Sequence, residues 1–393
     1  MNKVAVFIIR KSGFYGLEAE SVQRIKRYLL KNELIDVFEV EDISGICKIL
    51  CGNKSYKIIV LIYGDVYITS ESILRLSRIM ERHEAFPIIA PVSNEAFVPE
   101  QRCHPPYIYQ TPTVFKWAVN EVYQRYGDEI METEQIDNFC IAIKRDVFDS
   151  LQWDIQFNNI PNFLRDKGFR LHIAKGIYVH RYGNCYESDR NDILRLIPSN
   201  AVDILDIGCA NGLFGEILKK RQRCVVTGVE MNADAVNIAR GRLDIVIHGD
   251  IEEIIDKGIL GNYDCIICGD VLEHLNNPWG VVAGLRRHLR EKGFFIASTP
   301  NIANWSILYE MLHGRWDYVP FSILSGTHIR FFTKETLIEL FEDNGYLIRD
   351  ISFHGFEIPD KAMGFITSLK RLFPIVNEDE LKASEILIVA QRT

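Results

Sequence analysis

Short apolar segments alternate with amphipathic ones through the second half of this chain. Helices are expected between the apolar segments, for example over residues 214–221 and 277–292. The apolar segments predict strands at residues 201–208, 224–230, 244–250, 263–270 and 293–300. Strands that alternate with helices pair in parallel within a doubly wound α/β sheet.

The end of the chain predicts a change in this pattern. A helix is expected over residues 333–344, where an Asn-Gly pair stops it. Two further strands are expected at residues 347–356 and 385–392, with no long crossover between them. They predict an antiparallel edge on a Rossmann-like sheet.

The first half is also α/β, although its pattern is less regular. It predicts strands at 4–9, 57–65, 86–91 and 140–148, helices at 18–30 and 72–82, and a loop at 99–113. Because 393 residues exceed the usual size of one hydrophobic core, we expect two domains. The polar stretch 184–191 places the boundary near residue 186, giving domains 1–185 and 186–393.

Composition narrows the function classes. The net charge of -8 argues against a nonspecific nucleic-acid binder, which needs a concentrated basic face. There is neither a membrane-spanning apolar run nor a secretory signal, so we expect a cytoplasmic protein. The nine cysteines are expected to be free thiols, and Cys265 and Cys268 lie in an apolar strand where core packing is favoured over metal binding.

A glycine-rich turn follows the strand at 201–208 and opens a helix. Its glycines are Gly208, Gly212 and Gly215, which differs from the G-x-G-x-x-G order of dinucleotide enzymes. Glycines without Cβ atoms let a flat nucleoside approach the turn. Such a turn alone is a weak signal, and the alternative is a tight connection between a strand and a helix.

Acidic residues at successive strand ends add to the turn. Asp206, Glu230, Asp250 and Asp270 each stand at or just after the carboxyl end of a predicted strand. Open α/β sheets bind ligands at that edge, where an acid about twenty residues beyond the turn can accept hydrogen bonds from ribose hydroxyls. Four acids in this arrangement are hard to explain as helix caps.

In order and spacing these motifs resemble the class I S-adenosylmethionine-dependent methyltransferases, over nearly all of residues 189–393. The resemblance implies that the turn lines the methionine part of the donor, that Glu230 holds the ribose, and that Asp250 faces the adenine amino group. Ala210 stands where the family most often has glycine. The implied cofactor-binding residues are Asp206, Gly208, Cys209, Asn211, Gly212, Glu230, Met231, Asp250, Ile251, Asp270 and Val271.

Two histidines are candidate general bases for a hydroxyl acceptor. His274 lies in DVLEHL beside the donor, and His328 follows an insertion over residues 301–326 that we expect to cover the site or to pack on its own domain. This insertion carries Trp305, Tyr309, Trp316 and Tyr318. The T-H-x-R-F-F-T segment resembles methyltransferases found with polysaccharide and methionine-biosynthesis genes, which favours His328 as the base. Alternatively, its imidazole caps the helix after Thr333.

A metal is a further possibility. Asp270, Glu273 and His274 could share one helical face, which resembles the metal-assisting triplet of ubiquinone O-methyltransferases. The same motif is common in methyltransferases that use no metal. Metal dependence therefore stays open at the level of sequence.

The first half resembles, at the level of fold, a family 2 glycosyltransferase of the GT-A type. The matching pieces are residues 61–80, 86–94, 139–151 and 168–184. Only Asp65 stands where that family has paired acids, and residues 155–162 replace its acidic cluster. We therefore predict a degenerate transferase fold that binds a glycan or pairs with another enzyme; a plain α/β domain of another role is the alternative.

Taken together, the sequence predicts an O-methyltransferase acting on a hydroxyl of a sugar, a glycan or a similar small molecule. A nitrogen or carbon acceptor, a bifunctional glycosyltransferase-methyltransferase and a non-catalytic glycan-binding or scaffold protein are the alternatives. The sequence identifies neither the acceptor nor the oligomeric state.

Overall fold

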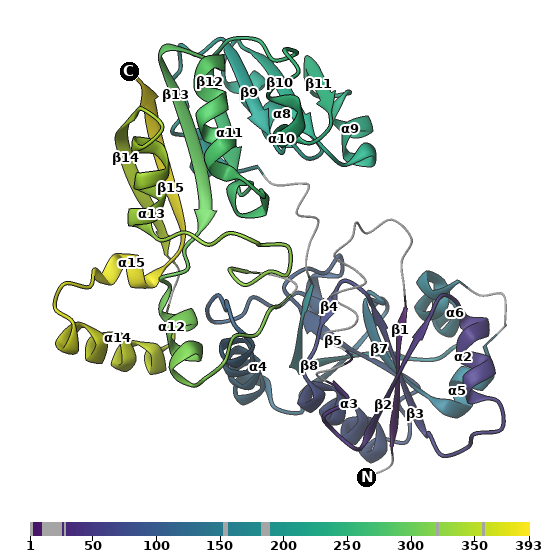
Figure 1. The fold of residues 1–393 in the computed structure, drawn as a ribbon. Helices are drawn as coiled ribbons and strands as arrows, with labels where there is room; N and C mark the ends of the chain where they lie inside the picture. Colours follow the sequence, from purple (N-terminus) through teal and green to yellow (C-terminus); the bar gives the residue numbers. More distant parts are fainter. Residues whose placement is uncertain are drawn as a thin grey trace. The chain divides into compact units, whose positions relative to one another are not determined.

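The computed structural model describes residues 3–9, 26, 29–151, 156–181, 189–319, 322–355 and 358–393. The chain divides into two compact units (Figure 1). One comprises Met1–Gly183 with Asp317–Phe321, and the other comprises Asn184–Trp316 with Ser322–Thr393. Each unit has its own β-sheet.

The sheet of the first unit has the order β2-β1-β3-β7-β5-β8-β4, and β6 pairs with β8. Its strands are β1 (Val4–Ile9), β2 (Ile35–Val40), β3 (Ile58–Tyr63), β4 (Val66–Tyr67), β5 (Ile88–Ser93), β6 (Ile130–Thr133), β7 (Cys140–Lys144) and β8 (Leu171–Arg181). β1 is parallel to β2 and β3, whereas β7 is antiparallel to β3 and β5. β1 and β5 are buried along their whole length, as expected of strands covered on both faces.

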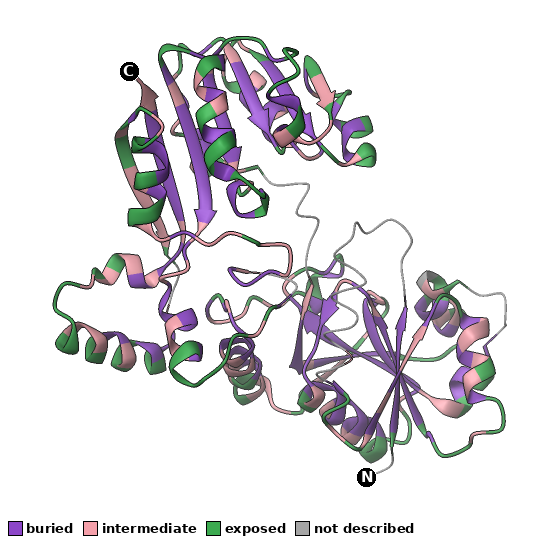
Figure 2. Cartoon of the chain, in the orientation of Figure 1, coloured by how far each residue is buried: buried purple, intermediate pink, exposed green. Residues whose placement is uncertain are grey.

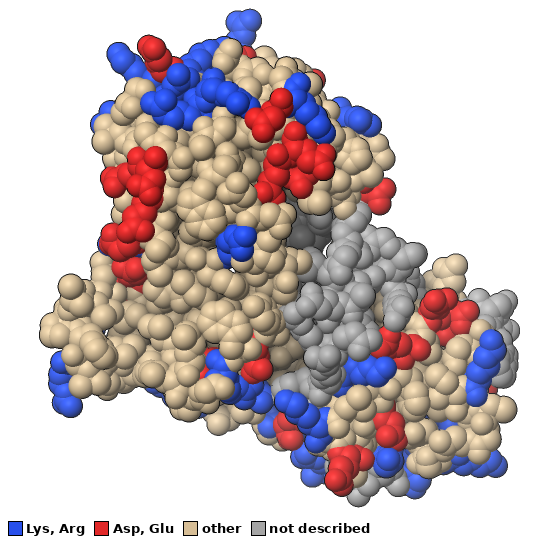
Figure 3. Space-filling model, viewed as in Figure 1, with Lys and Arg blue, Asp and Glu red and all other residues tan. Residues whose placement is uncertain are grey.

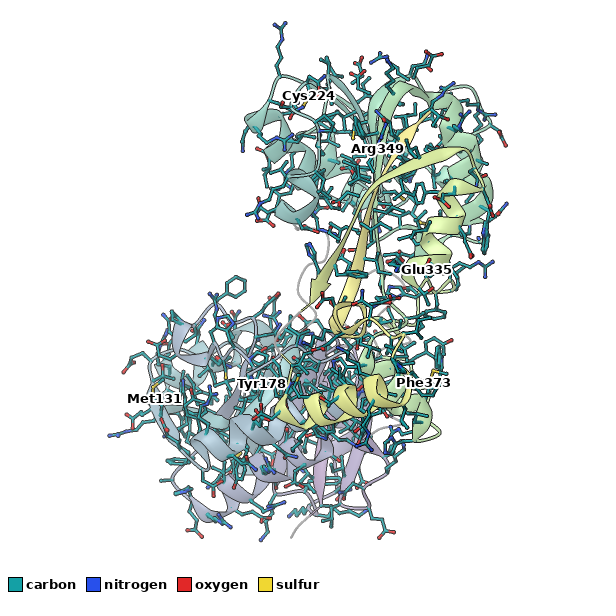
Figure 4. All side chains as sticks on the ribbon, turned by 90° about the vertical axis from the view of Figure 1, so that its left-hand side faces the viewer. Met131, Tyr178, Cys224, Glu335, Arg349 and Phe373 are labelled. Carbon is teal, nitrogen blue, oxygen red and sulfur yellow. The ribbon has the colours of Figure 1, made fainter. Side chains whose placement is uncertain are left out.

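Helices cover this first sheet. They are α2 (Ile43–Leu50), α3 (Ser70–Arg82), α4 (Pro112–Tyr126), α5 (Arg145–Asp149) and α6 (Ile160–Asp166), with short 3₁₀ turns at Pro99–Gln101 and Phe157–Asn159. Tyr178 of β8 is fully buried in this unit (Figure 4), where its hydroxyl lies 2.7 Å from that of Tyr109. A buried tyrosine hydroxyl needs such a partner, so the pair fixes both rings.

The predicted strands at 4–9, 57–65 and 86–91 are confirmed, and so is the helix at 72–82. The strand expected over 140–148 is wrong at its end, because β7 stops at Lys144 and α5 begins at Arg145. Arg145 and Asp149 are one helical turn apart, and Arg145 Nε forms an ion pair with Asp149 Oδ1 at 2.8 Å. Such a pair favours a helix over a strand at this position. Most of the helix expected at 18–30 falls outside the described residues.

The sheet of the second unit has the order β11-β10-β9-β12-β13-β15-β14. Its strands are β9 (Asp203–Ile207), β10 (Val225–Glu230), β11 (Ile245–His248), β12 (Tyr263–Gly269), β13 (Leu289–Pro300), β14 (Tyr346–Gly355) and β15 (Ala383–Arg392). The strands from β11 to β13 are parallel, and β15 is antiparallel to both β13 and β14. The chain adds strands on one side of β9 and then on the other, so the switch point lies between β9 and β12. Open α/β sheets bind ligands at such a point.

Helices pack on both faces of this sheet, which makes it doubly wound as predicted. The helices of this unit are α7 (Asn191–Leu194), α8 (Leu213–Arg221), α9 (Ala233–Ala239), α10 (Ile251–Ile254), α11 (Pro278–Leu285), α12 (Trp305–Leu312), α13 (Lys334–Glu342), α14 (Asp360–Leu372) and α15 (Glu378–Lys382). Of these, α12 and α14 pack on each other beyond the end of the sheet (Figure 1). Figure 2 shows the buried strands between exposed helix faces. Two apolar clusters form, one around Leu205, Leu285 and Phe341 and the other around Ile204, Leu218 and Ile267. Each such buried side chain contributes about 1.5–3 kcal/mol.

Three expectations for the second unit need correction. The helix expected over 277–292 ends at Leu285, and after a 3₁₀ turn at Arg286–His288 strand β13 begins at Leu289. The cause is a long-range pairing: Leu289 is fully buried and pairs with Tyr263 of β12, and after a shift of register the pairing continues from Phe294. β14 and β15 are antiparallel as predicted, but α14 and α15 stand between them in the chain, and β15 lies inside the sheet.

Charged side chains are unevenly distributed over the second unit, and two of its thiols lie in the core. On the face of the second unit seen in Figure 3, basic and acidic side chains gather in separate groups. Cys265 and Cys268 are fully buried, which confirms their core-packing role. Among the helices of the described residues, none has the length and apolar character needed to cross a bilayer.

Candidate donor and acceptor site

The glycine-rich turn joins β9 to α8 at the switch point. Gly208 and Gly212 have φ values of +69° and +78°, in the left-handed region that favours glycine. A Cβ on Gly208 would lie 2.6 Å from Cγ2 of Val271, which follows β12. The two loops thus touch, and only a residue without a side chain fits between them. Ala210 also has a positive φ, +50°, and carries the strain that a glycine would avoid.

Glu230 ends β10 beside this turn. Its carboxylate accepts hydrogen bonds from the backbone N–H groups of Ala210 at 3.0 Å and Asn232 at 2.7 Å. The side chain is buried, with 7% of the residue exposed. These bonds hold one carboxylate against both the glycine-rich turn and the start of α9.

Asp206 lies in β9, two residues before Gly208, and is buried. Burial, reinforced by the negative charge of Glu230, raises the pKa of Asp206 to about 7, although Arg190 opposes the shift. In the ligand-free protein this carboxyl is therefore about half protonated near neutral pH. A cation bound beside it would favour its ionised form.

The next acid, Asp250, follows β11 and is the N-cap of α10. Its Oδ1 accepts the N–H of Glu252 at 2.8 Å. The next residue, Ile251, is buried, whereas Met231, just after β10, is 72% exposed. Asp250 is therefore a helix cap, which was the alternative to ligand binding. Its second oxygen, Oδ2, takes no part in the cap.

Asp270 follows β12 with a φ of +54°. Its Oδ1 accepts a hydrogen bond from Ser298 Oγ at 2.8 Å, and its Oδ2 forms an ion pair with Arg190. Val271, half-buried, contacts Gly208 across the switch point. The four acids predicted at strand ends do therefore stand along one edge of the sheet.

Sequence reasoning missed Arg190. It precedes α7 and also bonds Asp192 Oδ2 at 2.8 Å, Glu385 Oε1 at 2.5 Å and Ser298 Oγ at 3.0 Å. Its partners are spread over almost 200 positions of the chain, so no local spacing could have indicated it. It is a cation within a predominantly acidic edge.

His274 and His328 lie together, with ring centroids 4.8 Å apart in an edge-to-face arrangement. His274 ends a 3₁₀ turn at Leu272–His274, and His328 lies just after the insertion of residues 301–326 that follows β13. Nδ1 of His274 lies 3.0 Å from the carbonyl oxygen of Thr327, and Nδ1 of His328 lies 2.9 Å from that of Ile323. A carbonyl can only accept, so each Nδ1 carries the proton and each Nε2 has a free lone pair.

Both imidazoles are neutral at physiological pH. Burial lowers the pKa of His328 to about 4, and the neighbouring His274 adds to that effect. Burial lowers the pKa of His274 as well. The idea that His328 caps the helix after Thr333 is wrong, because α13 is capped by the side chain of Thr333, which accepts from Thr336 N.

Glu273 belongs to the same 3₁₀ turn as His274. Only 1% of it is exposed; Thr299 Oγ1 stands 3.4 Å from its Oε2, and its Oε1 has no hydrogen-bond partner among the described residues. Burial, followed by repulsion from Asp270, holds the pKa of Glu273 well above its usual range. Ligand atoms of Glu273, His274 and His328 lie within 4.8 Å of one another.

The predicted triplet of Asp270, Glu273 and His274 does not form. Asp270 has a positive φ and precedes the 3₁₀ turn, so it shares no helical face with the other two. A second group of ligand atoms, from Asp192, His354 and Glu385, also lies within 4.8 Å. Arg190 already supplies a cation to two members of that group.

Comparison with known proteins bears on this edge of the sheet. The chain is 28% identical over 141 residues to a ubiquinone biosynthesis O-methyltransferase of Pasteurella multocida, covering 32% of this chain and 56% of the relative. It is 30% identical over 134 residues to the protein of that name from Glaesserella parasuis, again covering 32% and 56%. The chain thus spans little more than half the length of these curated relatives.

A solved S-adenosylmethionine-dependent methyltransferase from Archaeoglobus fulgidus aligns with 52% of this chain and 95% of its own, at 19% identity and a TM-score of 0.38. Residues 178–350 match a family model described as a methyltransferase domain. The chain therefore contains a methyltransferase domain.

The insertion of the methyltransferase domain has a small core of its own. Ile307, Ile323 and Leu324 are buried against one another. Trp305 is buried, whereas Trp316 is 39% exposed and its ring packs on Phe331. Tyr318 falls in the short segment Asp317–Phe321, which is grouped with the first unit. These apolar residues of the insertion therefore pack within their own domain, which is one of the two arrangements expected from the sequence.

Proposed function

We propose that the protein transfers the methyl group of S-adenosylmethionine to a hydroxyl of a sugar, a glycan or a similar small molecule. The match to a methyltransferase domain supports S-adenosylmethionine as the donor, and the similarity to ubiquinone biosynthesis O-methyltransferases supports an oxygen acceptor. Methylation of a nitrogen or carbon acceptor is the alternative within the same reaction class.

In this proposal the donor lies along the carboxyl edge of β9, β10, β11 and β12. Glu230 accepts hydrogen bonds from the ribose hydroxyls, and Asp250 accepts one from the adenine amino group, with Met231 and Ile251 beside the ring. The turn of Asp206, Gly208, Cys209, Asn211 and Gly212 lines the methionine part, and Asp270 and Val271 stand by the methyl group. The contact of Gly208 with Val271 supports this, because it brings the turn and the β12 loop to one point.

We propose that the guanidinium group of Arg190 lies near the donor's carboxylate and offsets its negative charge. It is the cation among Asp192, Asp270 and Glu385. Guanidinium groups bind carboxylates through two parallel hydrogen bonds. The same network would hold Arg190 in place before the donor arrives.

The observation that carries the choice of a hydroxyl acceptor is the pair of neutral histidines. Methyl transfer is a direct displacement, so the protein must align the acceptor oxygen behind the methyl group and take its proton. We assign the proton to Nε2 of His328, or to that of His274. Hydrogen bonds from both Nδ1 atoms to backbone carbonyls support this assignment, because they fix the tautomer that a base requires.

For the first unit we propose a degenerate glycosyltransferase-like fold that binds a glycan without transferring sugar. Asp65, the lone candidate for a metal-binding acid, is paired with Arg181 at 2.7 Å. A carboxylate held in that pair is a poor ligand for a metal-diphosphate complex. Hydrolysis or transfer of any nucleotide sugar by the protein would replace this proposal with the bifunctional one.

The decisive experiment has two parts. Calorimetric titration with S-adenosylmethionine should give one site, and Glu230→Ala should weaken it by roughly 10- to 100-fold, since a charge-assisted hydrogen bond is lost. An absence of binding, or binding indifferent to Glu230, would instead favour a non-catalytic scaffold protein.

Candidate acceptors are then screened for a mass gain of one methyl group. With a productive acceptor, His328→Ala should slow turnover by about 10²- to 10⁴-fold while donor affinity is unchanged. Unchanged turnover would move the base role to His274 or to no residue, which His274→Ala would decide.

A further inference from the structure

We propose that Glu252 and Arg330 are positioning residues for methyl transfer, and that both act through the turn at residues 276–277. Arg330 fixes the segment that carries His328 against this turn, and Glu252 connects the turn to the adenine end of the donor site. The roles of His328 and Asp250 in this inference rest on the proposed function.

Glu252 holds the turn by its N–H groups. Its Oε1 accepts the backbone N–H of Asn277 at 2.7 Å, and its Oε2 accepts the backbone and side-chain N–H groups of Asn276 at 2.9 and 3.1 Å. Partial burial opposes ionisation, but the hydrogen bonds from Asn276 and Asn277 outweigh it and lower the pKa of Glu252. Hydrogen bonds to an ionised acceptor are roughly twice as strong as neutral ones, so one carboxylate holds the turn firmly.

The same residue adjoins the donor site. Glu252 lies in the first turn of α10, where its own N–H is bound by Asp250 Oδ1 at 2.8 Å. Asp250 is the acid proposed to face the adenine. The carboxylate of Glu252 therefore ties residues 276–277 to the part of the site where the adenine is proposed to bind.

Arg330 holds the turn by its carbonyl group. Its Nη2 donates to the carbonyl oxygen of Asn276, which lies 54 positions earlier in the chain. The backbone N–H groups of Ile329 and Arg330 both donate to the carbonyl oxygen of Glu273, at 2.8 and 3.0 Å. These contacts join the segment at residues 328–330 to the loop that follows β12.

The joined segment determines where both imidazoles stand. His328 belongs to the segment, and Nδ1 of His274 bonds the carbonyl oxygen of Thr327, the residue before it. When the bond from Arg330 is lost, His328 moves with the segment and His274 loses the carbonyl that fixes its tautomer. A displacement of about 1 Å can slow a reaction by about 10²-fold, because the reacting atoms are no longer aligned.

The first test needs no acceptor, because its probe is the imidazole nitrogen signal of the full chain labelled with ¹⁵N-histidine. Long-range ¹H–¹⁵N spectra of the wild type should show His274 and His328 protonated at Nδ1, with the signals assigned from His274→Gln and His328→Gln. In Arg330→Ala both signals should shift toward a mixture of tautomers. The other histidines report in the same spectra whether the variant is folded.

Arg286→Ala is the matched control. The side chain of Arg286 also donates to carbonyl oxygens of distant segments, those of Gly345 and Thr393, both at 3.1 Å. It lies just before β13, at the amino end of the sheet and away from the acids at the strand ends. Its loss should leave the signals of His274 and His328 unchanged.

The second test uses the acceptor identified by its gain of one methyl group. Arg330→Ala should lower kcat by about 10- to 100-fold with donor affinity unchanged, and Arg330→Lys, which can still donate to Asn276, should lose less. Glu252→Gln should lower kcat and also weaken binding of S-adenosylmethionine, because its carboxylate adjoins Asp250. The two effects on kcat should not add in the double variant, since both residues act through one turn.

Unchanged histidine signals in Arg330→Ala would overturn the proposal. It would equally be overturned by a loss of kcat that Arg286→Ala reproduces, or by effects of Arg330→Ala and Glu252→Gln that simply add. Titration of the wild type with S-adenosylmethionine tests the donor site by itself. If the donor does not bind, the proposed function fails, while the histidine signals still decide whether Arg330 positions the rings.

Discussion

Asp206 is the residue whose charge depends most on what surrounds it. It is buried next to Glu230, and its pKa is raised to about 7. The donor carries an ammonium and a sulfonium group, and either one near Asp206 would favour the ionised carboxylate. Donor binding and loss of a proton are then one linked event.

We therefore expect S-adenosylmethionine to bind with release of a proton at pH 6. Affinity should rise with pH up to about 7 and then level off, because Asp206 is already ionised above that value. Calorimetry at pH 6 in two buffers of different ionisation enthalpy measures the released proton directly. Equal observed enthalpies in the two buffers would contradict the linkage.

The same residue should affect stability without any ligand. The folded-state pKa of about 7 lies above that of an unfolded aspartate, about 3.9. Between these values the folded protein holds the additional proton, so its free energy of unfolding falls as pH rises, by up to about 1.4 kcal/mol per pH unit. Asp206→Asn removes this loss and should be more stable than the wild type at pH 8. Urea unfolding at pH 5 and pH 8 tests this, and a pH-independent difference between the two proteins would refute it.

At the scale of elements, Gly208 and Val271 determine how closely the loop after β9 approaches the loop after β12. Gly208→Ala would combine a φ of +69° with a Cβ 2.6 Å from Val271 Cγ2. Gly258 has nearly the same φ, +68°, but open space around it. Gly258→Ala should therefore cost only the backbone strain, about 1–2 kcal/mol, and Gly208→Ala clearly more.

Denaturant unfolding of the two alanine variants measures the difference. Val271→Ala supplies the internal control, because it removes the atom that the new Cβ would meet. The pair Gly208→Ala and Val271→Ala should show a favourable coupling energy in a double-mutant cycle. Equal losses for the two glycine positions would mean that the loops can separate freely.

Strands and helices could be predicted from the sequence where apolar and amphipathic segments alternate regularly. The acids at the ends of these strands could be predicted too. Strands β9 to β12 and the edge on which Asp206, Glu230, Asp250 and Asp270 stand depend on local patterns. The start of β13 could not be predicted, since Leu289 becomes a strand residue only through its pairing with Tyr263. The same holds for the site: the meeting of His328 with Glu273 and the partners of Arg190 are long-range contacts.

At the scale of the whole molecule, the two units have separate sheets and cores. A ligand that binds one unit protects the amides of that unit through linkage. We expect S-adenosylmethionine to slow hydrogen exchange in residues 204–212, 228–232 and 250–252, with no change in the strands of the first unit. Peptide-level exchange measured by mass spectrometry tests this. Protection spread equally over β1, β3 and β5 would mean that the units unfold together.

The position of β15 inside the sheet affects how the methyltransferase domain folds during its synthesis. β15 pairs with both β13 and β14, although it follows both in the chain. Until residues 383–392 have left the ribosome, β14 has no partner in the sheet and β13 has an open edge. Such an edge can template pairing with other chains. Slow translation or truncation shortly before residue 383 should therefore favour aggregation of the nascent chain over a nearly complete fold.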